Sequence, residues 1–342
     1  MRAPWYSTER IAAMICDFCE FRCDLSACSV CRSYAQDGGK IVELDPFSWT
    51  TCRVSLCEDI PFFHYYPRTR LLELGGARCN ASCGYCINAR IVDAEKKPAF
   101  INMSAEEIIK TARLSGCAGI HFGINEVTCN LISALEIAEK AKSAGLKVSA
   151  CTNGYMTEET ASLVAGLFDG LNISLKSISP DYYREVIGLP DLEAVKRNIS
   201  FFAKKIHIEV TTPVAQGIND GEMNEIAGFL AGIDRELPWH IFRLIPEHKM
   251  KDIAAPDVRE LAKKVLQVRE VLPYTYFSNF IGSILDNTLC PECGATLIRR
   301  LCVKSCGATL TEYNLTKENT CPVCGKSIRI AGHADDAVWR KA

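Results

Sequence analysis

The sequence predicts an α/β fold in which parallel strands alternate with helices, flanked by cysteine-rich segments at both ends. Apolar or β-branched runs recur along the middle of the chain, and amphipathic segments with helix start signals lie between them. Such repeated βα units form either a doubly wound sheet or a complete or partial barrel. In each of these arrangements, ligands bind at the carboxyl ends of the strands.

The elements follow one another from residue 70 onward. A capping box starts one helix, because Glu107 lies three residues after Ser104, and Thr157 starts another. Gly116 and Gly145 lie where two helices should end. The organisation therefore predicts a cysteine-rich metal-binding region, a (β/α) domain and a zinc-ribbon-like region over residues 1–69, 70–286 and 287–342. The expected core strands cover residues 70–76, 118–124, 147–154, 170–177, 205–214, 240–246 and 274–280.

Composition excludes several classes of protein. The 342 residues are 48% hydrophobic and carry a formal net charge of −2, which gives no basic surface for nucleic acid. No apolar run approaches the roughly 18–20 residues of a membrane span. Glu9, Arg10 and Asp17 interrupt the first segment, so it lacks the apolar stretch of a signal peptide. We expect a cytoplasmic protein that binds neither nucleic acid nor a membrane.

Cysteine usage points to metals. The chain has 19 cysteines, and all but Cys117, Cys129 and Cys151 fall into three groups. Disulfide scaffolds are usually short and poor in core, whereas this chain is long and rich in apolar residues. Clustered cysteines in a reducing compartment are typical of metal ligands.

The central group is Cys79-x3-Cys83-x2-Cys86, directly after the first expected core strand. A cubane iron–sulfur cluster has four irons, so three thiolates leave one iron without a protein ligand. Catalytic metal sites keep such an open position, and structural sites close it. The alternative is an ordinary zinc or ferredoxin site, completed by Cys117, Cys129 or Cys151.

The spacing of these cysteines, with Tyr85 before the last one, resembles the signature of the radical S-adenosylmethionine (SAM) superfamily. The resemblance implies a partial (β/α)6 TIM-like barrel and a [4Fe–4S] cluster on Cys79, Cys83 and Cys86. It also implies that SAM binds the open iron and is cleaved to methionine and a 5′-deoxyadenosyl radical. An electron donor such as flavodoxin or ferredoxin is implied as well.

The resemblance extends over nearly the whole chain. "CTNGYMTEET", "EVTTPVAQGIND" and "WHIFRLIPEHKM" are similar to segments of radical SAM enzymes of the AmmeMemoRadiSam system, which are relatives of pyruvate formate-lyase activating enzyme. Two departures suggest altered chemistry or substrate: the family's acidic motif becomes Asn125-Glu126, followed by Cys129, and Ser174 replaces an aspartate. The resemblance implies no particular catalytic residue, but it implies cofactor contacts at Tyr85, Asn125, Glu126, Asn153, Ser174, Lys176, His240 and Arg243.

The outer cysteine groups predict two further metal sites. Cys290-x2-Cys293 and Cys321-x2-Cys324 form two knuckles typical of a zinc ribbon, with Cys302 and Cys306 as substitutes and an auxiliary iron–sulfur cluster as the alternative. The N-terminal group offers five thiols to one zinc or rubredoxin-like iron, or to a cluster that relays electrons, and Cys52 and Cys57 could contribute. These five are Cys16, Cys19, Cys23, Cys28 and Cys31.

Relatives of the activating enzymes act on proteins, so we expect a protein substrate. The altered motif with Cys129 resembles cysteine-rich radical SAM proteins of methanogens that C-methylate residues of methyl-coenzyme M reductase, including a glutamine. This resemblance favours cobalamin-dependent C-methylation, although no cobalamin-binding motif is recognisable, so a corrin would have to bind elsewhere. The alternatives are a glycyl-radical activating enzyme and a non-catalytic metal-binding or electron-carrying protein.

Overall fold

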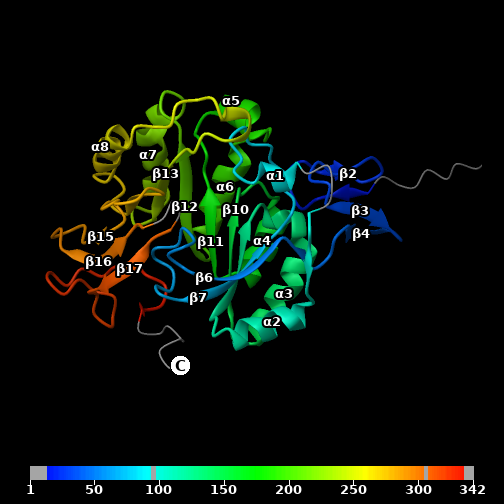
Figure 1. Ribbon diagram of the computed structural model, residues 1–342, viewed down its shortest axis with the longest axis horizontal. Coiled ribbons are helices and arrows are strands. Elements are labelled where there is room, and N and C mark those ends of the chain that lie inside the picture. Colours follow the sequence, from blue (N-terminus) through cyan, green and yellow to red (C-terminus); the bar gives the residue numbers. More distant parts are fainter. Residues whose placement is uncertain (1–13, 94–97, 304–306, 335–342) are drawn as a thin grey trace, which may run out of the picture.

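A single large sheet organises the computed structural model, which describes residues 14–93, 98–303 and 307–334. Across these residues its strand order is β14-β13-β12-β11-β10-β9-β7-β6, and all neighbours pair in parallel except β6 and β7. The parallel strands are those expected from the sequence, and the α/β barrel prediction is confirmed (Figure 1). Their bounds are β7 Arg70–Gly75, β9 Gly119–Ile124, β10 Lys147–Thr152, β11 Gly170–Ser174, β12 His207–Val214, β13 Trp239–Arg243 and β14 Thr275–Ser278, with β6 at Thr51–Leu56.

Helices follow the strands and cover the outer face of the sheet (Figure 1). The capping box at Ser104 is formed, since its hydroxyl accepts from the Glu107 N–H and the Glu107 carboxylate accepts from the Ser104 N–H. Thr157 also caps its helix, as expected. The main helices are α2 Ala105–Leu114, α3 Leu131–Ser143, α4 Glu158–Leu167, α6 Glu193–Phe202, α7 Met223–Ile233 and α8 Val258–Val268. Shorter turns are α1 Ala89–Val92, η1 Val127–Asn130, α5 Pro180–Tyr182, the π-helical η2 Tyr183–Ile187, η3 Asp220–Glu222 and η4 His248–Met250.

Side chains on the strands alternate between the helices and the interior of the barrel. Leu72 and Ile120 stand in register and belong to the main apolar core, which the helices cover. The next positions, Glu73 and His121, are polar and buried. Both are hydrogen-bonded: Glu73 accepts from Arg53 and Ser55, and His121 Nδ1 lies 3.0 Å from Ser149 Oγ.

Residues 60–66 close the amino end of the barrel. The Glu209 carboxylate, at the start of β12, accepts from the backbone N–H groups of Phe63 (2.9 Å) and His64 (2.7 Å). Gly170 leaves room for the Tyr65 ring, because a β-carbon at Gly170 would lie 2.7 Å from Tyr65 Cε2. This segment therefore closes the barrel at the end opposite to the carboxyl-end loops.

Small antiparallel sheets form both ends of the described chain. The N-terminal hairpins lie beside α3, and the C-terminal sheet packs on the amino end of the barrel near Phe63 (Figure 1). No helix in the described ranges combines the length and apolar character needed to cross a membrane. The remaining strands are β1 Ile15–Cys16, β2 Cys23–Asp24, β3 Tyr34–Asp37, β4 Lys40–Glu43, β5 Ser48–Trp49, β8 Ile101–Asn102, β15 Thr288–Leu289, β16 Thr296–Leu301 and β17 Thr309–Tyr313.

Candidate functional site

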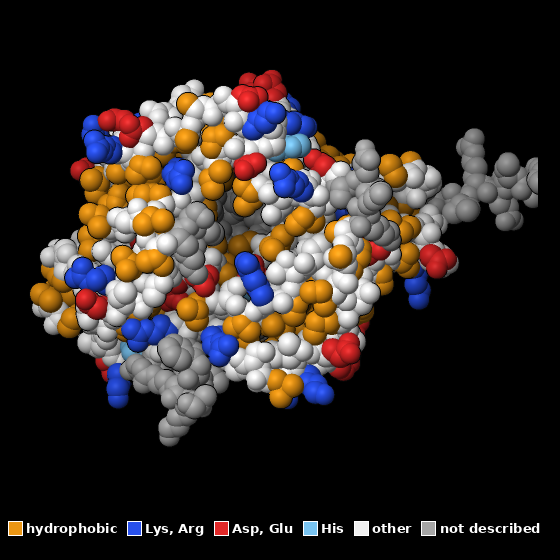
Figure 2. All heavy atoms as spheres, viewed as in Figure 1, with side chains coloured by type: hydrophobic (Ala, Val, Ile, Leu, Met, Phe, Trp, Pro, Cys, Tyr) orange, Lys and Arg blue, Asp and Glu red, His pale blue; other side chains and the backbone are white. Residues whose placement is uncertain are grey.

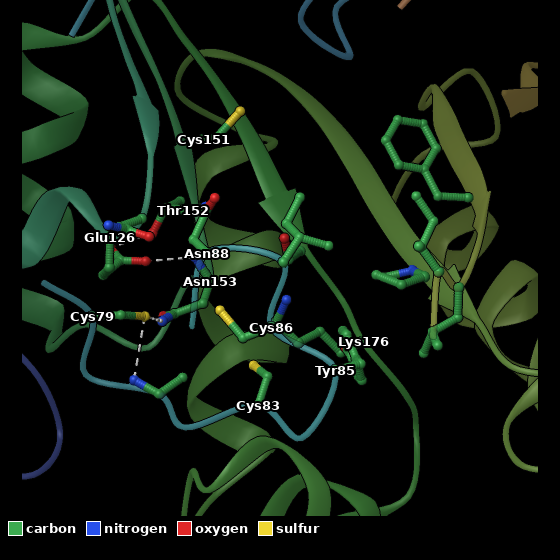
Figure 3. A pocket seen from close by; sticks show the side chains of 18 of the residues that line it. Cys79, Cys83, Tyr85, Cys86, Asn88, Glu126, Cys151, Thr152, Asn153 and Lys176 are labelled. Atoms are coloured by element: carbon green, nitrogen blue, oxygen red, sulfur yellow. Dashed lines mark hydrogen bonds between the residues drawn. The ribbon is translucent and has the colours of Figure 1, made fainter. Parts of the chain in front are cut away.

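The loop after β7 brings Cys79, Cys83 and Cys86 together at the carboxyl end of the barrel, where their sulfurs face a common space (Figure 3). Backbone bonds fix this loop against the end of η2. The Ser82 N–H donates to Ile187 O (2.9 Å), and the Gly84 N–H donates to Val186 O (2.8 Å). A π-helical turn thus serves as the support for the three-cysteine loop, consistent with the frequent placement of such turns at functional sites.

The thiols lie in an environment that favours a bound metal over free thiolates. Burial raises the pKa of Cys79, and the Glu126 carboxylate adds to this effect. Burial likewise raises the pKa of Cys86. The Lys176 ammonium lowers both values, but does not offset burial. A metal centre would supply the positive charge that the thiolates need, so the donor set fits an iron–sulfur cluster.

A cavity of about 280 Å³ opens beside the thiols. The loops that follow the strands line it, as expected for the ligand end of a barrel. The molecule is hollowed near the centre of the face in Figure 2. Of the eight predicted cofactor contacts, seven line this cavity: Tyr85, Asn125, Glu126, Asn153, Ser174, Lys176 and Arg243.

Glu126 is the most firmly held of these side chains. It caps η1 and is buried. Its Oε1 accepts from Thr128 N (3.1 Å), Thr128 Oγ1 (3.1 Å) and Thr152 Oγ1 (2.8 Å), and Oε2 accepts from Asn153 N (2.7 Å). Burial raises its pKa, and these hydrogen bonds oppose that rise. The carboxylate therefore faces the cavity in one fixed orientation (Figure 3).

Asn125 and Asn153 join neighbouring loops. Asn125 has a left-handed backbone (φ 65°), and its amide donates to Gly76 O at 2.7 Å. Asn153 Nδ2 donates to Asn80 Oδ1 at 2.7 Å and lies 3.9 Å from Cys79 Sγ. Each amide thus fixes part of the cysteine loop as well as lining the cavity.

Positive charge enters the cavity from two strands. Lys176 follows β11, with Nζ 5.9 Å from the centre of the Tyr85 ring. Arg243 ends β13, and its Nε is buried with no hydrogen-bond partner among the described residues. A buried N–H without a partner is costly, so a ligand that accepts from it would be favoured. Carboxylates are natural acceptors for arginine.

His240 lies elsewhere. It is the second residue of β13, near the amino end of the strand, and is fully buried away from the lining of this cavity. Its Nε2 lies 2.6 Å from Glu209 Oε2, and His207 Nε2 lies 3.0 Å from Oε1. Burial would raise the pKa of Glu209, but the two histidines outweigh it and hold that pKa well below its usual range.

Two further side chains line the cavity: Cys151, which the sequence offered as a fourth ligand for the central cysteines, and Asn279, which the sequence did not single out. Cys151, on β10, lines the cavity, but it points away from the three cysteines (Figure 3) and lies 3.6 Å from His121 Nε2. Asn279 follows β14, where its amide accepts from Arg243 N and donates to Arg243 O. Their positions depend on the pairing of strands distant in sequence.

The four ribbon thiols form a compact group. The ligand atoms of Cys290, Cys293, Cys321 and Cys324 all lie within 4.8 Å of one another, a geometry that can hold one tetrahedral ion. Cys302 is apart from them, since its thiol donates to Gly307 O at 3.4 Å. Cys306 lies outside the described residues.

The N-terminal cysteines separate into different surroundings. Cys16 and Cys31 belong to one buried cluster with Cys129 of the barrel, and the partly buried Cys23 packs against it. Cys19 packs with the main core, and Cys28 is exposed. Cys57 lies in a further cluster with Phe62 and Tyr65, whereas Cys52 lies on β6.

Comparisons with known proteins agree with this geometry. A family model described as the radical SAM superfamily matches residues 75–230. An uncharacterized protein of Methanocaldococcus jannaschii is 31% identical over 311 residues, which cover 87% of this chain and 86% of that protein. A probable GTP 3′,8-cyclase of Thermococcus kodakarensis is 30% identical over 45% of this chain, which spans only 50% of the length of that relative.

Solved structures include SuiB of Streptococcus suis bound to S-adenosylmethionine, with 13% identity, a TM-score of 0.48, and coverage of 61% of this chain and 50% of that one. The family match spans the cysteine loop and the strands that carry Glu126, Asn153 and Lys176. Its members bind a [4Fe–4S] cluster and SAM, which suits the three thiols and the cavity beside them. The chain is a member of the radical SAM superfamily.

Proposed function

We propose that this radical SAM enzyme modifies an unactivated C–H bond of a protein substrate, and that the modification is cobalamin-dependent C-methylation. The feature that carries the protein-substrate part is the apolar mouth of the cavity. Ile87 lines the cavity and is 70% exposed, and Ile281, two residues after the lining residue Asn279, is 75% exposed. Exposed apolar side chains around a cavity are typical of a surface that receives another macromolecule.

The chain's own residues would bind and orient the cofactors. When bound, the cluster and SAM supply a 5′-deoxyadenosyl radical that can remove hydrogen from a C–H bond. Cys79, Cys83 and Cys86 would hold the cluster. Glu126 would accept a hydrogen bond from the amino group of SAM, and Arg243 would pair with a carboxylate.

Methylation is favoured by the relationship to proteins of methanogens. The relative in Methanocaldococcus jannaschii matches 87% of this chain, whereas the GTP 3′,8-cyclase matches 45% of it. The methanogen protein is therefore similar over a longer part of this chain than the cyclase is. A substrate found in methanogens, such as methyl-coenzyme M reductase, would fit that relationship.

The terminal sites complete the proposal. The four ribbon thiols would bind zinc and stabilise a segment too small for a core of its own. Flavodoxin or ferredoxin would supply the electron. The corrin would dock from the solvent side of the mouth.

The test is anaerobic reconstitution with iron, sulfide, SAM, a reductant, cobalamin and the candidate protein. Formation of both 5′-deoxyadenosine and S-adenosylhomocysteine, with one methyl group added to the protein by mass spectrometry, supports methylation. Deoxyadenosine alone, with a glycyl EPR doublet on the partner, would replace methylation by activation. If Cys83→Ala matches the native enzyme in every product, the radical chemistry itself is wrong, and Cys117→Ala serves as the matched cysteine control.

A further inference from the structure

Four thiols meet where the N-terminal segment joins the barrel. Cys16, Cys31 and Cys129 are buried in one cluster with Leu25 and Tyr34, and the partly buried Cys23 packs against it. Cys16 and Cys23 stand opposite each other in the β1–β2 pair. Cys129 comes from η1, the turn that Glu126 caps, almost a hundred residues after Cys31 in sequence.

Hydrogen bonds fix the backbone around Cys129. The Tyr34 hydroxyl donates to Thr128 O at 2.6 Å and accepts from the Leu131 N–H at 2.8 Å, so it holds the backbone on both sides of Cys129. The Thr157 hydroxyl donates to Asp17 O at 2.7 Å beside Cys16. These contacts hold η1 against the N-terminal segment, so that Cys129 lies in the same cluster as Cys31.

A cysteine that is buried only for packing has apolar groups around its sulfur. Here backbone donors point at the sulfurs instead: the Val30 N–H lies 3.4 Å from Cys23 Sγ, and the N–H groups of Phe18 and Ser33 bond Cys16 and Cys31. In these two pairs the donor lies two residues after the cysteine, and the same spacing occurs in the ribbon, where the backbone N–H groups of Ala295 and Lys326 bond Cys293 and Cys324.

We propose that Cys16, Cys23, Cys31 and Cys129 ligate an iron–sulfur cluster at the junction of the N-terminal segment and the barrel. A single ion holds its sulfurs at ~2.3 Å, which keeps four thiolates within about 4 Å of one another. The ribbon thiols approach that spacing, but of the residues described no other set of three His, Cys, Asp or Glu lies within 4.8 Å. The wider spacing at the junction suits ligands on separate irons, as in the Cys79 loop.

A cluster at this junction would also affect the cavity beside Cys79, because Cys129 and Glu126 belong to the same turn. Glu126 caps the short turn η1, and the Cys129 N–H within that turn donates to Glu126 O at 3.0 Å. A cluster at Cys129 would fix η1 and, through it, the Glu126 carboxylate. Cys129 is then a positioning residue for the cavity as well as a ligand.

The test separates this centre from the radical SAM cluster by removing the latter. The Cys79→Ala/Cys83→Ala/Cys86→Ala protein, reconstituted anaerobically, is expected to retain iron and acid-labile sulfide with a visible charge-transfer band. Adding Cys129→Ala should lower the affinity for iron by at least about tenfold, since even changes to residues around metal ligands cost 10–100-fold. The amounts of bound iron and sulfide should fall with it. Adding Cys28→Ala, at an exposed thiol outside the group, should change neither.

Zinc retained in the ribbon and an unchanged far-UV circular dichroism spectrum control for folding, because the ribbon does not include Cys129. Iron and sulfide that persist after Cys129→Ala would overturn the proposal. So would a triple variant that holds no iron, or one that holds a single ion without sulfide. None of these readouts depends on the reaction that the enzyme catalyses.

Discussion

Gly188 lies directly against Ser82, so that a β-carbon at Gly188 would overlap the Ser82 hydroxyl. Gly188 ends the π-helical turn with φ 73°, a left-handed conformation that favours glycine. Because the turn supports the three-cysteine loop, we expect Gly188→Ala to displace that loop. The measurement is iron bound per chain after reconstitution, which should fall several-fold, together with SAM cleavage.

Gly217 offers the matched control for this substitution. It has φ 75°, yet a β-carbon there would meet no atom within 4 Å. Gly217→Ala therefore carries the same backbone strain, on the order of 1 kcal/mol, without the clash. Equal iron content in the two variants would show that the Gly188 contact does not position the cysteines.

Glu126→Gln should weaken SAM binding and destabilise the barrel. The substitution removes a buried carboxylate that accepts four hydrogen bonds and turns an NH2 group toward one of the donors. Leaving buried donors unpaired costs about 1–3 kcal/mol each, which lowers the free energy of unfolding. Loss of the carboxylate that accepts from the amino group of SAM should also lower the affinity for SAM by tenfold or more. Equilibrium binding of SAM to the iron-loaded protein checks this.

Thr128→Val serves as the milder comparison. It removes one hydroxyl donor to Glu126 and leaves the carboxylate in place. SAM affinity should change less than threefold, equivalent to roughly 0.5–1 kcal/mol. A loss in Thr128→Val as large as that in Glu126→Gln would mean that the carboxylate has no direct part in binding.

The protonated Asp286 carboxyl should stabilise the folded protein at low pH, so that the free energy of unfolding falls as pH rises. Burial raises its pKa from 3.8 to about 7, against the Ser278 hydrogen bond and the charges of Arg300 and Arg269. Between these pH values the folded protein keeps a proton that the unfolded chain releases. The stabilisation is complete below about pH 4 and lost through pH 7, with a size on the order of 4 kcal/mol.

Asp286→Asn isolates this contribution, because the amide keeps the shape of the carboxyl and cannot ionise. Thermal unfolding of the two proteins should be similar at pH 5, and the variant should unfold several degrees higher at pH 8. A difference that does not vary with pH would assign the effect to packing instead. Other buried groups, such as His64 and His121, whose pKa values are lowered by burial to about 3 and about 4, are present in both proteins, so their contributions cancel in the comparison.

Metal removal should loosen the amino end of the barrel. Arg300, on β16 of the ribbon, lies 4.1 Å from the centre of the Phe63 ring and donates to Phe63 O at 2.8 Å. Cys324→Ser, or a strong chelator, should therefore lower the melting temperature by several degrees and expose residues 60–66 to hydrogen exchange. Cys28→Ser, at an exposed thiol elsewhere, should change neither. Unchanged protection of residues 60–66 would contradict the coupling.

Much of the fold followed from local pattern. Each expected parallel strand is present, since β-branched runs and helix caps are local signals. The predicted carboxyl ends ran too far in several cases: the strand expected over residues 170–177 ends at Ser174. Leu175 is fully buried, and so it reads as strand although its backbone has already turned into the ligand loop. The antiparallel strand β6 was not anticipated, because its pairing with β7 is a tertiary contact.

The site was partly readable for the same reason. Cys79, Cys83 and Cys86 lie on one loop, so their spacing alone indicated a shared metal centre. Cys129 was considered only for the central site, because its place beside Cys31 depends on how the N-terminal hairpins pack beside α3. His240 falls in a motif of the resembling family, yet only strand pairing reveals that its ring faces Glu209.

The closure of the barrel by residues 60–66 also sets an order of events during synthesis. Arg300 and Ala331, which bond the backbone of Phe63, His64 and Tyr66, follow all the parallel strands in the chain. During synthesis these contacts can therefore form only after the strands of the barrel have been made. The segment that closes the amino end is thus fixed later than the sheet it covers.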